Sequence, residues 1–205
     1  SRKYWKESGK LLSVLALTLR GTPFLYQGQE IGMMDFDFTR MRQLNDVESK
    51  NVERVLRRFH VPRRLRWSLI SRTSRDNART PFQWDGSAKA GFTTGRPWLG
   101  VNHNCREINL ADQEGDADSI WSWYKDLAAL RRERDVLRRG DFTPLEAGRQ
   151  VFAYRRALGE EQLTVALNFS NRPARADYRG KLVRSNYPRR SFDGTLQPWE
   201  AVILE

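Results

Sequence analysis

The first apolar pattern along the chain predicts a helix that is buried on more than one side. Its apolar residues lie at helical spacing and widen the face beyond a single stripe: Leu11, Leu12, Val14, Leu15, Ala16, Leu17 and Leu19. Gly21 and Pro23 are expected to end this helix, because glycine is favoured just past a helix end and proline cannot continue one. Residues 24–26 (Phe-Leu-Tyr), closed by Gly28, then predict a short buried strand, which completes one step of an alternating α/β fold.

The next part of the chain is polar and mostly irregular. Residues 47–59 carry apolar positions at helical spacing and predict a basic amphipathic helix that Pro62 ends. Residues 71–109 are polar and contain several glycines, with little regular pattern. This stretch is rich in side chains that can bind sugars or water, namely Arg75, Asp76, Asn77, Arg79, Gln83, Trp84, Trp98 and Asn102. A long loop of this kind in a compact domain indicates a functional or mobile segment.

The clearest helical pattern comes next, and it precedes a change of period. Apolar residues recur at Ile120, Trp123, Tyr124, Leu127 and Leu130, and an aromatic stripe at this spacing is typical of core packing. Asp116 or Asp118 is expected to cap the start of this helix, and Gly140 is expected to end it.

After Gly140 the pattern becomes that of strands separated by turns. Residues 150–156, 162–169, 181–184 and 200–204 predict strands, and glycine, proline and Asn/Asp turn signals lie between them. Short strands with closely spaced turns predict a small antiparallel β-sandwich. The sequence therefore predicts an α/β part in residues 1–140 and an all-β domain in residues 141–205.

The composition permits a sizeable core and excludes several function classes. The chain has 205 residues, of which 39% are hydrophobic, and no apolar run approaches the roughly 18 to 20 residues that span a bilayer. Its first residues lack the pattern of a signal peptide, so a soluble cytoplasmic protein without a membrane partner is expected. Cys105 is the single cysteine and excludes an internal disulfide, and the two histidines leave little material for a metal site. No cofactor and no metal are predicted.

The formal net charge of +11 raises nucleic acid as a partner. Arginines are densest between Arg54 and Arg75, where they could form a phosphate-binding patch. The alternative is a solvated helical face, and it is favoured because no nucleic-acid-binding motif accompanies the charge.

Two motifs resemble glycoside hydrolase family 13. Residues 21–33 (Gly-Thr-Pro-Phe-Leu-Tyr-Gln-Gly-Gln-Glu-Ile-Gly-Met) are similar to the segment around the eighth barrel strand of its α-glucosidases. Residues 74–85 (Ser-Arg-Asp-Asn-Ala-Arg-Thr-Pro-Phe-Gln-Trp-Asp) resemble the signature of its oligo-1,6-glucosidase and α-glucosidase members. Shorter matches continue in order to the closing strand, so the resemblance covers essentially the whole chain.

The resemblance implies the C-terminal end of a (β/α)8 TIM barrel in residues 1–140, followed by the β-sandwich domain in residues 141–205. It also implies an enzyme that hydrolyses α-glucosidic bonds of oligosaccharides or disaccharides with retention, using an Asp nucleophile, a Glu acid and a second Asp. In the family these three carboxylates precede the segment that matches this chain. No catalytic residue is therefore assigned, and the isolated chain is expected to be inactive.

The resemblance implies supporting roles for two arginines. Arg75 is expected to hold sugar hydroxyls and the ionised nucleophile, and Arg79 to support the loop. In the alternative, both arginines support the loop and pair with Asp76, Asp85 or backbone carbonyls.

Three further residues are singled out by their place in the two motifs. Gln83 and Trp84 are expected to lock the loop, with an aromatic platform for a glucose ring as the alternative role of Trp84. Glu30 follows the presumed barrel strand, on the side where barrel enzymes place their sites. It is a candidate substrate-binding residue, and the competing interpretation is that it hydrogen-bonds neighbouring loops.

Other functions remain open on the sequence. Trehalose synthases share the Arg-Thr-Pro-x-Gln-Trp core, but the preceding residues favour an α-glucosidase, and a sucrose-active relative is a further alternative. From another class, the chain could be a non-catalytic carbohydrate-binding module or a nucleic-acid-binding basic module. No aromatic ladder in residues 141–205 supports the carbohydrate-binding alternative.

Overall fold

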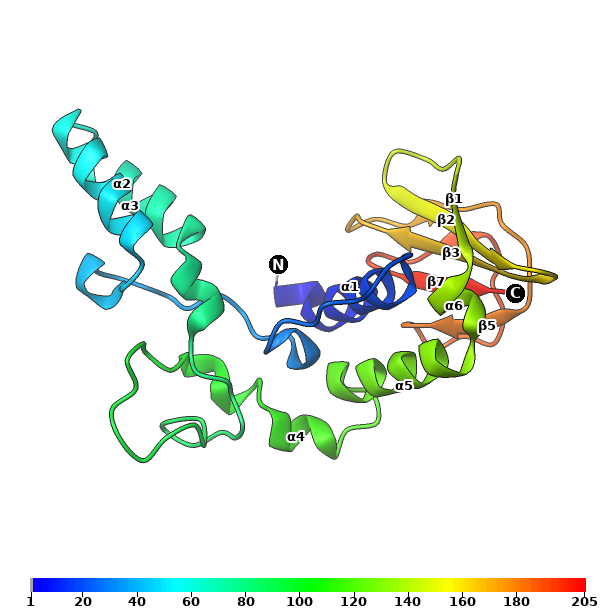
Figure 1. Cartoon of the computed structure of the whole chain (residues 1–205), viewed down its shortest axis with the longest axis horizontal. Coiled ribbons are helices and arrows are strands. Elements are labelled where there is room, and N and C mark those ends of the chain that lie inside the picture. The colour runs from blue at the N-terminus through cyan, green and yellow to red at the C-terminus, as the bar shows by residue number, and fades with distance from the viewer. Residues whose placement is uncertain (1) are drawn as a thin grey trace. The chain divides into compact units, whose positions relative to one another are not determined.

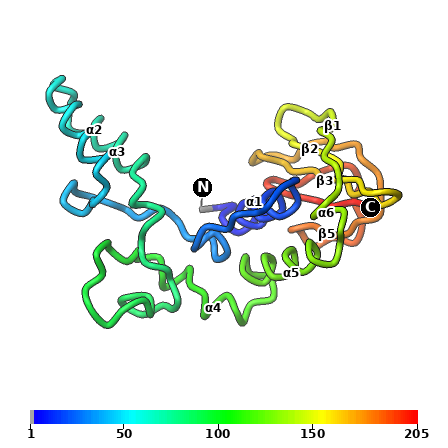
Figure 2. The backbone as a smooth tube through the Cα atoms, viewed as in Figure 1, coloured from blue at the N-terminus to red at the C-terminus, as the bar shows by residue number. Residues whose placement is uncertain are grey.

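The computed structural model describes residues 2–205, which divide into two compact units. One unit combines the residues up to Gly32 with Asp116–Glu205, and the other is Met33–Gly115. Figures 1 and 2 follow the chain through both units from blue at the N-terminus to red at the C-terminus. The domain boundary expected at residue 140 stays a prediction.

The first unit packs three helices against strands. Its helices are α1 (Trp5–Thr18), α5 (Ile120–Glu133) and α6 (Asp135–Arg139), with a short 3-10 helix at Gln29–Ile31. Its strands are β1 (Asp141–Leu145), β2 (Val151–Leu158), β3 (Glu161–Asn168), β4 (Ala174–Arg175), β5 (Leu182–Ser185), β6 (Thr195–Leu196) and β7 (Ala201–Leu204). The second unit contains α2 (Val47–Arg58), α3 (Arg63–Thr73) and α4 (Leu110–Glu114), with 3-10 helices at Met41–Gln43, Arg75–Arg79 and His103–Arg106.

The strands form an antiparallel sheet, as the sequence predicts. Five strands pair in the order β1-β2-β3-β7-β5, and β4 pairs with β6 in a separate two-stranded sheet. The four predicted strands correspond to β2, β3, β5 and β7. The strands β1, β4 and β6 were not predicted. Pro144 of β1 is accommodated because β1 lies at a sheet edge.

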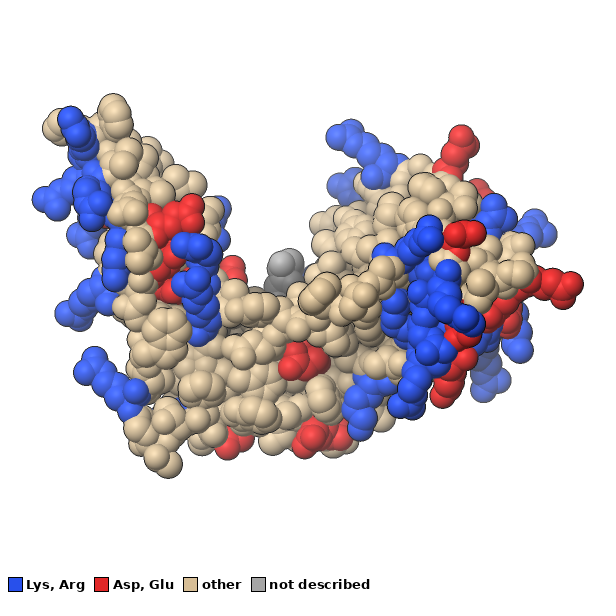
Figure 3. All heavy atoms as spheres, viewed as in Figure 1, with Lys and Arg blue, Asp and Glu red and all other residues tan. Residues whose placement is uncertain are grey.

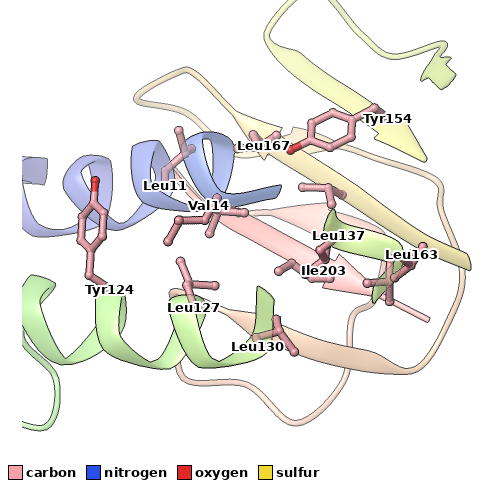
Figure 4. Packing of buried hydrophobic residues seen from close by; sticks show 14 of the residues in the cluster. Leu11, Val14, Tyr124, Leu127, Leu130, Leu137, Tyr154, Leu163, Leu167 and Ile203 are labelled. Atoms are coloured by element: carbon pink, nitrogen blue, oxygen red, sulfur yellow. The ribbon is translucent and has the colours of Figure 1, made fainter. Parts of the chain in front are cut away.

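The interior strand β7 is apolar at four successive positions because both of its faces are buried. Ala201 and Ile203 face the cluster formed with the helices, whereas Val202 and Leu204 face a second cluster that includes residues of the two-stranded sheet. Successive side chains of a strand point to opposite faces, so both faces of this sheet are buried. Figure 4 shows the helical side of this core, where Leu127 of α5 points toward Val14 of α1 and Ile203 lies on β7.

Three predictions about the helical part need correction. The run Phe24 to Tyr26 is not a strand, and Phe24 is 88% exposed. A strand requires a neighbouring strand to satisfy its backbone groups, and no described strand pairs with this segment. The Tyr26 amide and carbonyl are hydrogen-bonded to Gln29 instead. The long helix is N-capped by Ser119, whose hydroxyl accepts a hydrogen bond from the Ser122 amide at 3.0 Å, rather than by Asp116 or Asp118.

The Asp118 carboxylate instead pairs with two lysines of α1. Lys10 Nζ lies 2.5 Å from one carboxylate oxygen and Lys6 Nζ lies 2.7 Å from the other. The predicted helix is also interrupted, because Arg134 is extended between α5 and α6. Gly140 does end α6, and a side chain there would collide with the Val136 carbonyl.

A buried arginine joins the helices of this unit to the sheet. Arg156 of β2 is 0% exposed and donates to the Thr18 carbonyl at 2.5 Å, the Leu137 carbonyl at 2.9 Å and the Gly140 carbonyl at 2.8 Å. These carbonyls lie at the C-terminal ends of α1 and α6, where helices leave acceptors without partners. A cation also interacts favourably with the negative end of a helix, so this charge is satisfied without a carboxylate.

Arg131 of α5 binds the same region and shares the Leu137 carbonyl with Arg156. Its guanidinium donates to the Leu17 carbonyl at 2.6 Å, the Leu137 carbonyl at 2.8 Å and the Gly21 carbonyl at 2.6 Å. Burial, and after it the positive charge of Arg138, lowers the pKa of Arg131. Donation to these carbonyl oxygens offsets the cost of burying the guanidinium charge. The two arginines therefore fix the ends of α1 and α6 against β2.

We predict that Arg156→Met lowers the free energy of unfolding of the chain by about 3 kcal/mol or more, because several buried carbonyls lose their donors. Arg155→Met is the matched control, since the Arg155 guanidinium makes only an exposed contact with Gln162 at 3.4 Å. The control is expected to change stability by less than about 0.5 kcal/mol. Urea unfolding followed by circular dichroism measures both values, and equal losses for the two variants would contradict the proposed role of Arg156.

Candidate functional site

The loop that carries the signature motif is fixed to the start of helix α2 by a buried carboxylate. Asp46 is the N-cap of α2 and is 3% exposed. Its Oδ2 accepts hydrogen bonds from the Ser49 amide at 3.1 Å and the Ser49 hydroxyl at 2.7 Å. Its Oδ1 accepts from Arg75 Nε at 3.1 Å and Nη2 at 2.9 Å.

These contacts keep Asp46 ionised. Burial by itself raises the pKa of this carboxyl, but the hydrogen bonds from Ser49 and then those from Arg75 outweigh burial and lower the pKa to about 2. The negative charge of Asp46 is therefore permanent at neutral pH, and it holds one edge of the Arg75 guanidinium.

A second buried carboxylate completes the cluster. Asp76 is fully buried, and its Oδ2 accepts from the Asn45 amide at 2.6 Å and the Asp46 amide at 2.8 Å. Its Oδ1 has no hydrogen-bond partner in the described part of the chain, and Arg79 Nη1 lies 3.5 Å away from it. Arg79 Nη1 is also 3.9 Å from Asp46. Two arginines and two carboxylates thus form one group, which we call the Asp46 cluster: Asp46, Arg75, Asp76 and Arg79.

Arg75 keeps part of its guanidinium available. Its side chain is 56% exposed, and its hydrogen bonds use Nε and Nη2. Within residues 2–205 its Nη1 has no hydrogen-bond partner, so this nitrogen can donate to a ligand while the opposite edge stays on Asp46.

Gln83 and Trp84 hold the second half of the loop. Gln83 is fully buried, and its amide nitrogen donates to Asn104 Oδ1 at 3.1 Å and to the Ile108 carbonyl. The Trp84 backbone bonds both Ala90 and Ala111. The Trp84 indole is half exposed and stacks obliquely on Phe82, with ring centroids 4.6 Å apart. The locking role of Gln83 and Trp84 stays a prediction, and half of the Trp84 side chain is exposed.

Glu30 belongs to the other unit and makes a local contact. Its Oε2 accepts a hydrogen bond from the Gly28 amide at 2.7 Å. Burial, followed by the charge of Glu30, raises the pKa of Tyr124 to about 12. The structure therefore brings Arg75 and Arg79 together, places Trp84 in the same unit with Phe82 as its ring partner, and describes Glu30 within the first unit.

The sequence interpretation missed Asp46. Asp85 was considered as an arginine partner, but it accepts from the Ser87 amide at 2.9 Å within its own turn. The signal for Asp46 was present, because an Asp three residues before Ser49 at the start of an apolar-periodic segment is typical of a helix N-cap. Its partnership with Arg75, 29 residues further along, carries no local signature.

A hollow lies beside the cluster within the same unit. It has a volume of about 610 Å³ and is lined by Phe36, Arg42, Gln43, Asn45, Arg96, Pro97, Trp98, Leu99 and Gly100. Asn45 Nδ2 donates to the Trp98 carbonyl at 3.1 Å, so the residue next to Asp46 also forms part of the wall. Amide, guanidinium and indole groups are suited to binding sugar hydroxyls and pyranose faces.

The basic residues of the second unit follow its two long helices. Figure 3 shows Lys and Arg side chains along the α2–α3 hairpin, with acidic side chains among them. Arg66 of α3 pairs with Glu53 of α2 at 3.1 Å. In the part of the chain that the structure describes, no group of three or more His, Cys, Asp or Glu could hold a metal ion. No described helix is long and apolar enough to cross a membrane.

Comparison with known proteins assigns the chain to a class of carbohydrate-active enzymes. The alpha amylase catalytic domain matches residues 1–140. The glucan 1,6-alpha-glucosidase of Streptococcus pneumoniae is 38% identical over 209 residues, which cover 100% of this chain and 39% of that protein. The oligo-1,6-glucosidase of Parageobacillus thermoglucosidasius is 38% identical over 217 residues, covering 99% of this chain and 38% of that protein.

Solved structures agree with this assignment. A mutant isomaltulose synthase from Erwinia rhapontici, in complex with its natural substrate sucrose, superposes with a TM-score of 0.92 at 34% identity, covering 100% of this chain and 39% of that one. The chain belongs to the alpha-amylase family, glycoside hydrolase family 13. It spans about 39% of the length of the first curated relative that it matches.

We predict a pH-dependent contribution of Asp46 to stability. The folded pKa of about 2 lies below the ordinary value of 3.8, so the ionised carboxylate stabilises the fold above pH 4, and this stabilisation is lost as the pH falls toward 2. The free energy of unfolding of the wild type should exceed that of Asp46→Asn by about 2 kcal/mol at pH 7, and this difference should shrink between pH 4 and pH 2. Asparagine also caps helices, so the comparison isolates the charge.

Urea unfolding at a series of pH values measures this difference. Glu48→Gln is the control, because the Glu48 carboxylate is exposed and contacts the same arginine only at 3.4 Å. The free energy of unfolding of Glu48→Gln should stay close to that of the wild type at every pH. A constant gap between wild type and Asp46→Asn from pH 7 to pH 2 would contradict the ionised, buried state of Asp46.

Proposed function

We propose that this chain forms the substrate-side part of a retaining α-glucosidase that hydrolyses terminal α-glucosidic bonds of oligosaccharides or disaccharides. The proposal is supported by the signature loop and by the names of the relatives, glucan 1,6-alpha-glucosidase and oligo-1,6-glucosidase. Because the chain spans about 39% of such a relative, the activity is proposed for a whole protein to which this chain contributes one part. The observation that carries it is an arginine held by a buried carboxylate on one edge and open on the other.

The proposed architecture is the end of a (β/α)8 barrel followed by a C-terminal β domain. In this proposal residues 1–140 contribute to the barrel, which is supported by the range of the family match. The exposed run Phe24 to Tyr26 has the composition of a barrel strand, and neighbouring barrel strands would supply the strand pairing that no described strand gives it. Residues 141–205 form the β domain.

The chemistry proposed for the whole enzyme is a double displacement. A carboxylate attacks the anomeric carbon while an acid protonates the leaving oxygen, and water then releases the sugar. Arg75 would donate from Nη1 to a sugar hydroxyl and keep the nucleophilic carboxylate ionised by its charge. Such a reaction uses two carboxylates and water, so no metal or cofactor is proposed.

The remaining candidates take secondary roles in this proposal. Arg79 compensates the buried charge of Asp76 and supports the loop. Trp84 offers its half-exposed indole to a sugar ring. Glu30 fixes its own turn through the Gly28 amide and lies on the substrate side of the barrel. The expected cytoplasmic location stays a prediction, as does the absence of nucleic-acid binding.

Rearrangement of sucrose is a second candidate function. It is favoured by the match to the isomaltulose synthase bound to sucrose. The two functions differ in their products, because hydrolysis of sucrose releases glucose and fructose, whereas rearrangement gives an isomeric disaccharide. Product analysis on sucrose and on isomaltose therefore separates them.

The proposed function is tested with a fusion enzyme. We define it as this chain joined to the part of the Parageobacillus thermoglucosidasius oligo-1,6-glucosidase that the match does not cover. The fusion is expected to hydrolyse p-nitrophenyl α-glucoside and isomaltose. The 205-residue chain alone is expected to show no turnover, since its assigned residues only bind and orient.

The intact relative serves as the positive control, and circular dichroism establishes that the fusion is folded. If the fusion does not fold, residues 33–115 alone replace the corresponding unit of the relative. A folded hybrid without turnover would contradict the proposed function. Robust hydrolysis by the 205-residue chain alone would contradict the assignment of the catalytic carboxylates to other parts of the enzyme.

A further inference from the structure

We infer that Asp46 is a positioning residue that aims the Arg75 guanidinium at the substrate and couples it to helix α2. The inference rests on the proposed function, which gives Arg75 a sugar to bind. Asp46 lies outside the signature motif, in the segment before the basic amphipathic helix.

The two oxygens of Asp46 have separate tasks. Oδ2 is held by the amide and hydroxyl of Ser49 in the first turn of α2, and Oδ1 receives both Nε and Nη2 of Arg75. Rotating the carboxylate toward either partner would break the bonds to the other. The orientation of the Arg75 guanidinium plane is therefore set by the direction in which α2 begins.

The main chain of Asp46 reinforces this arrangement. Its amide donates to Asp76 Oδ2 at 2.8 Å, while its side chain accepts from Arg75, the residue directly before Asp76. Asp46 at the start of α2 thus accepts a hydrogen bond from Arg75 and donates one to Asp76, the next residue of the loop. A shift of this loop relative to the start of α2 would break at least one buried hydrogen bond.

Burial distinguishes Asp46 from the other carboxylate near Arg75. Glu48 Oε2 lies 3.4 Å from the same Nη2, but the Glu48 side chain is 69% exposed. An exposed ion pair of this length contributes little, because water and salt screen it. The buried Asp46 makes two charge-assisted hydrogen bonds and dominates the position of the arginine.

The decisive experiment is a double-mutant cycle in the fusion enzyme. Asp46→Asn is expected to lower kcat/KM for isomaltose about tenfold, and Glu48→Gln to change it less than about twofold. Because Asp46 acts through Arg75, adding Asp46→Asn to Arg75→Gln should produce no further loss.

A second readout needs no activity. In the 205-residue chain, the Arg75 Nε–H signal in NMR spectra should exchange slowly with solvent in wild type and Glu48→Gln, and rapidly in Asp46→Asn. An unchanged exchange rate in Asp46→Asn would overturn the inference.

The outcomes separate the inference from the proposed function. A folded fusion without activity contradicts the proposed function and with it the substrate-directed role of Asp46, while the NMR exchange rate still decides whether Asp46 fixes Arg75. An active fusion in which Arg75→Gln lowers kcat/KM but Asp46→Asn does not overturns the inference alone. A further loss on adding Asp46→Asn to Arg75→Gln also overturns it, because Asp46 would then act independently of Arg75.

Discussion

Arginine side chains that satisfy buried oxygen atoms are the interaction on which both units of this chain depend. A guanidinium carries five donors in a rigid plane, so a single residue can satisfy several acceptors that burial has removed from water. Arg156 does this for backbone carbonyls at the ends of two helices, whereas Arg75 does it for a buried carboxylate. The high arginine content therefore serves the fold in part, because some of these guanidinium groups donate hydrogen bonds to buried oxygen atoms.

The candidate site follows from the same constraint with one difference. Arg156 is enclosed and all of its described contacts are internal, but Arg75 has a half-exposed side chain whose Nη1 has no hydrogen-bond partner among residues 2–205. An arginine that is fixed on one edge and open on the other has lost most of its conformational freedom before a ligand arrives. Such preorganisation favours binding because less entropy is lost on association. The buried negative charge of Asp46 is thus as important to the proposed site as the arginine itself.

The sequence predicted the elements whose periodicity is local. The amphipathic helix of residues 47–59, the helix starting near Ile120 and the central strands were all visible as apolar patterns, and the family motifs were visible as short strings. The strand expected at Phe24 to Tyr26 did not form, because strand pairing depends on partners that no described residue supplies. The Asp46 cluster was missed for a related reason: ion pairs between residues about 30 positions apart leave no periodic signal.

The central claim is that the open edge of Arg75 faces the substrate while its other edge stays on Asp46. A crystal structure of the fusion enzyme with bound glucose tests it most directly. The account predicts that Arg75 Nη1 lies within hydrogen-bonding distance of a sugar hydroxyl and that Nε and Nη2 remain on Asp46. A sugar bound in the active site with the Arg75 guanidinium turned away from it would contradict the account.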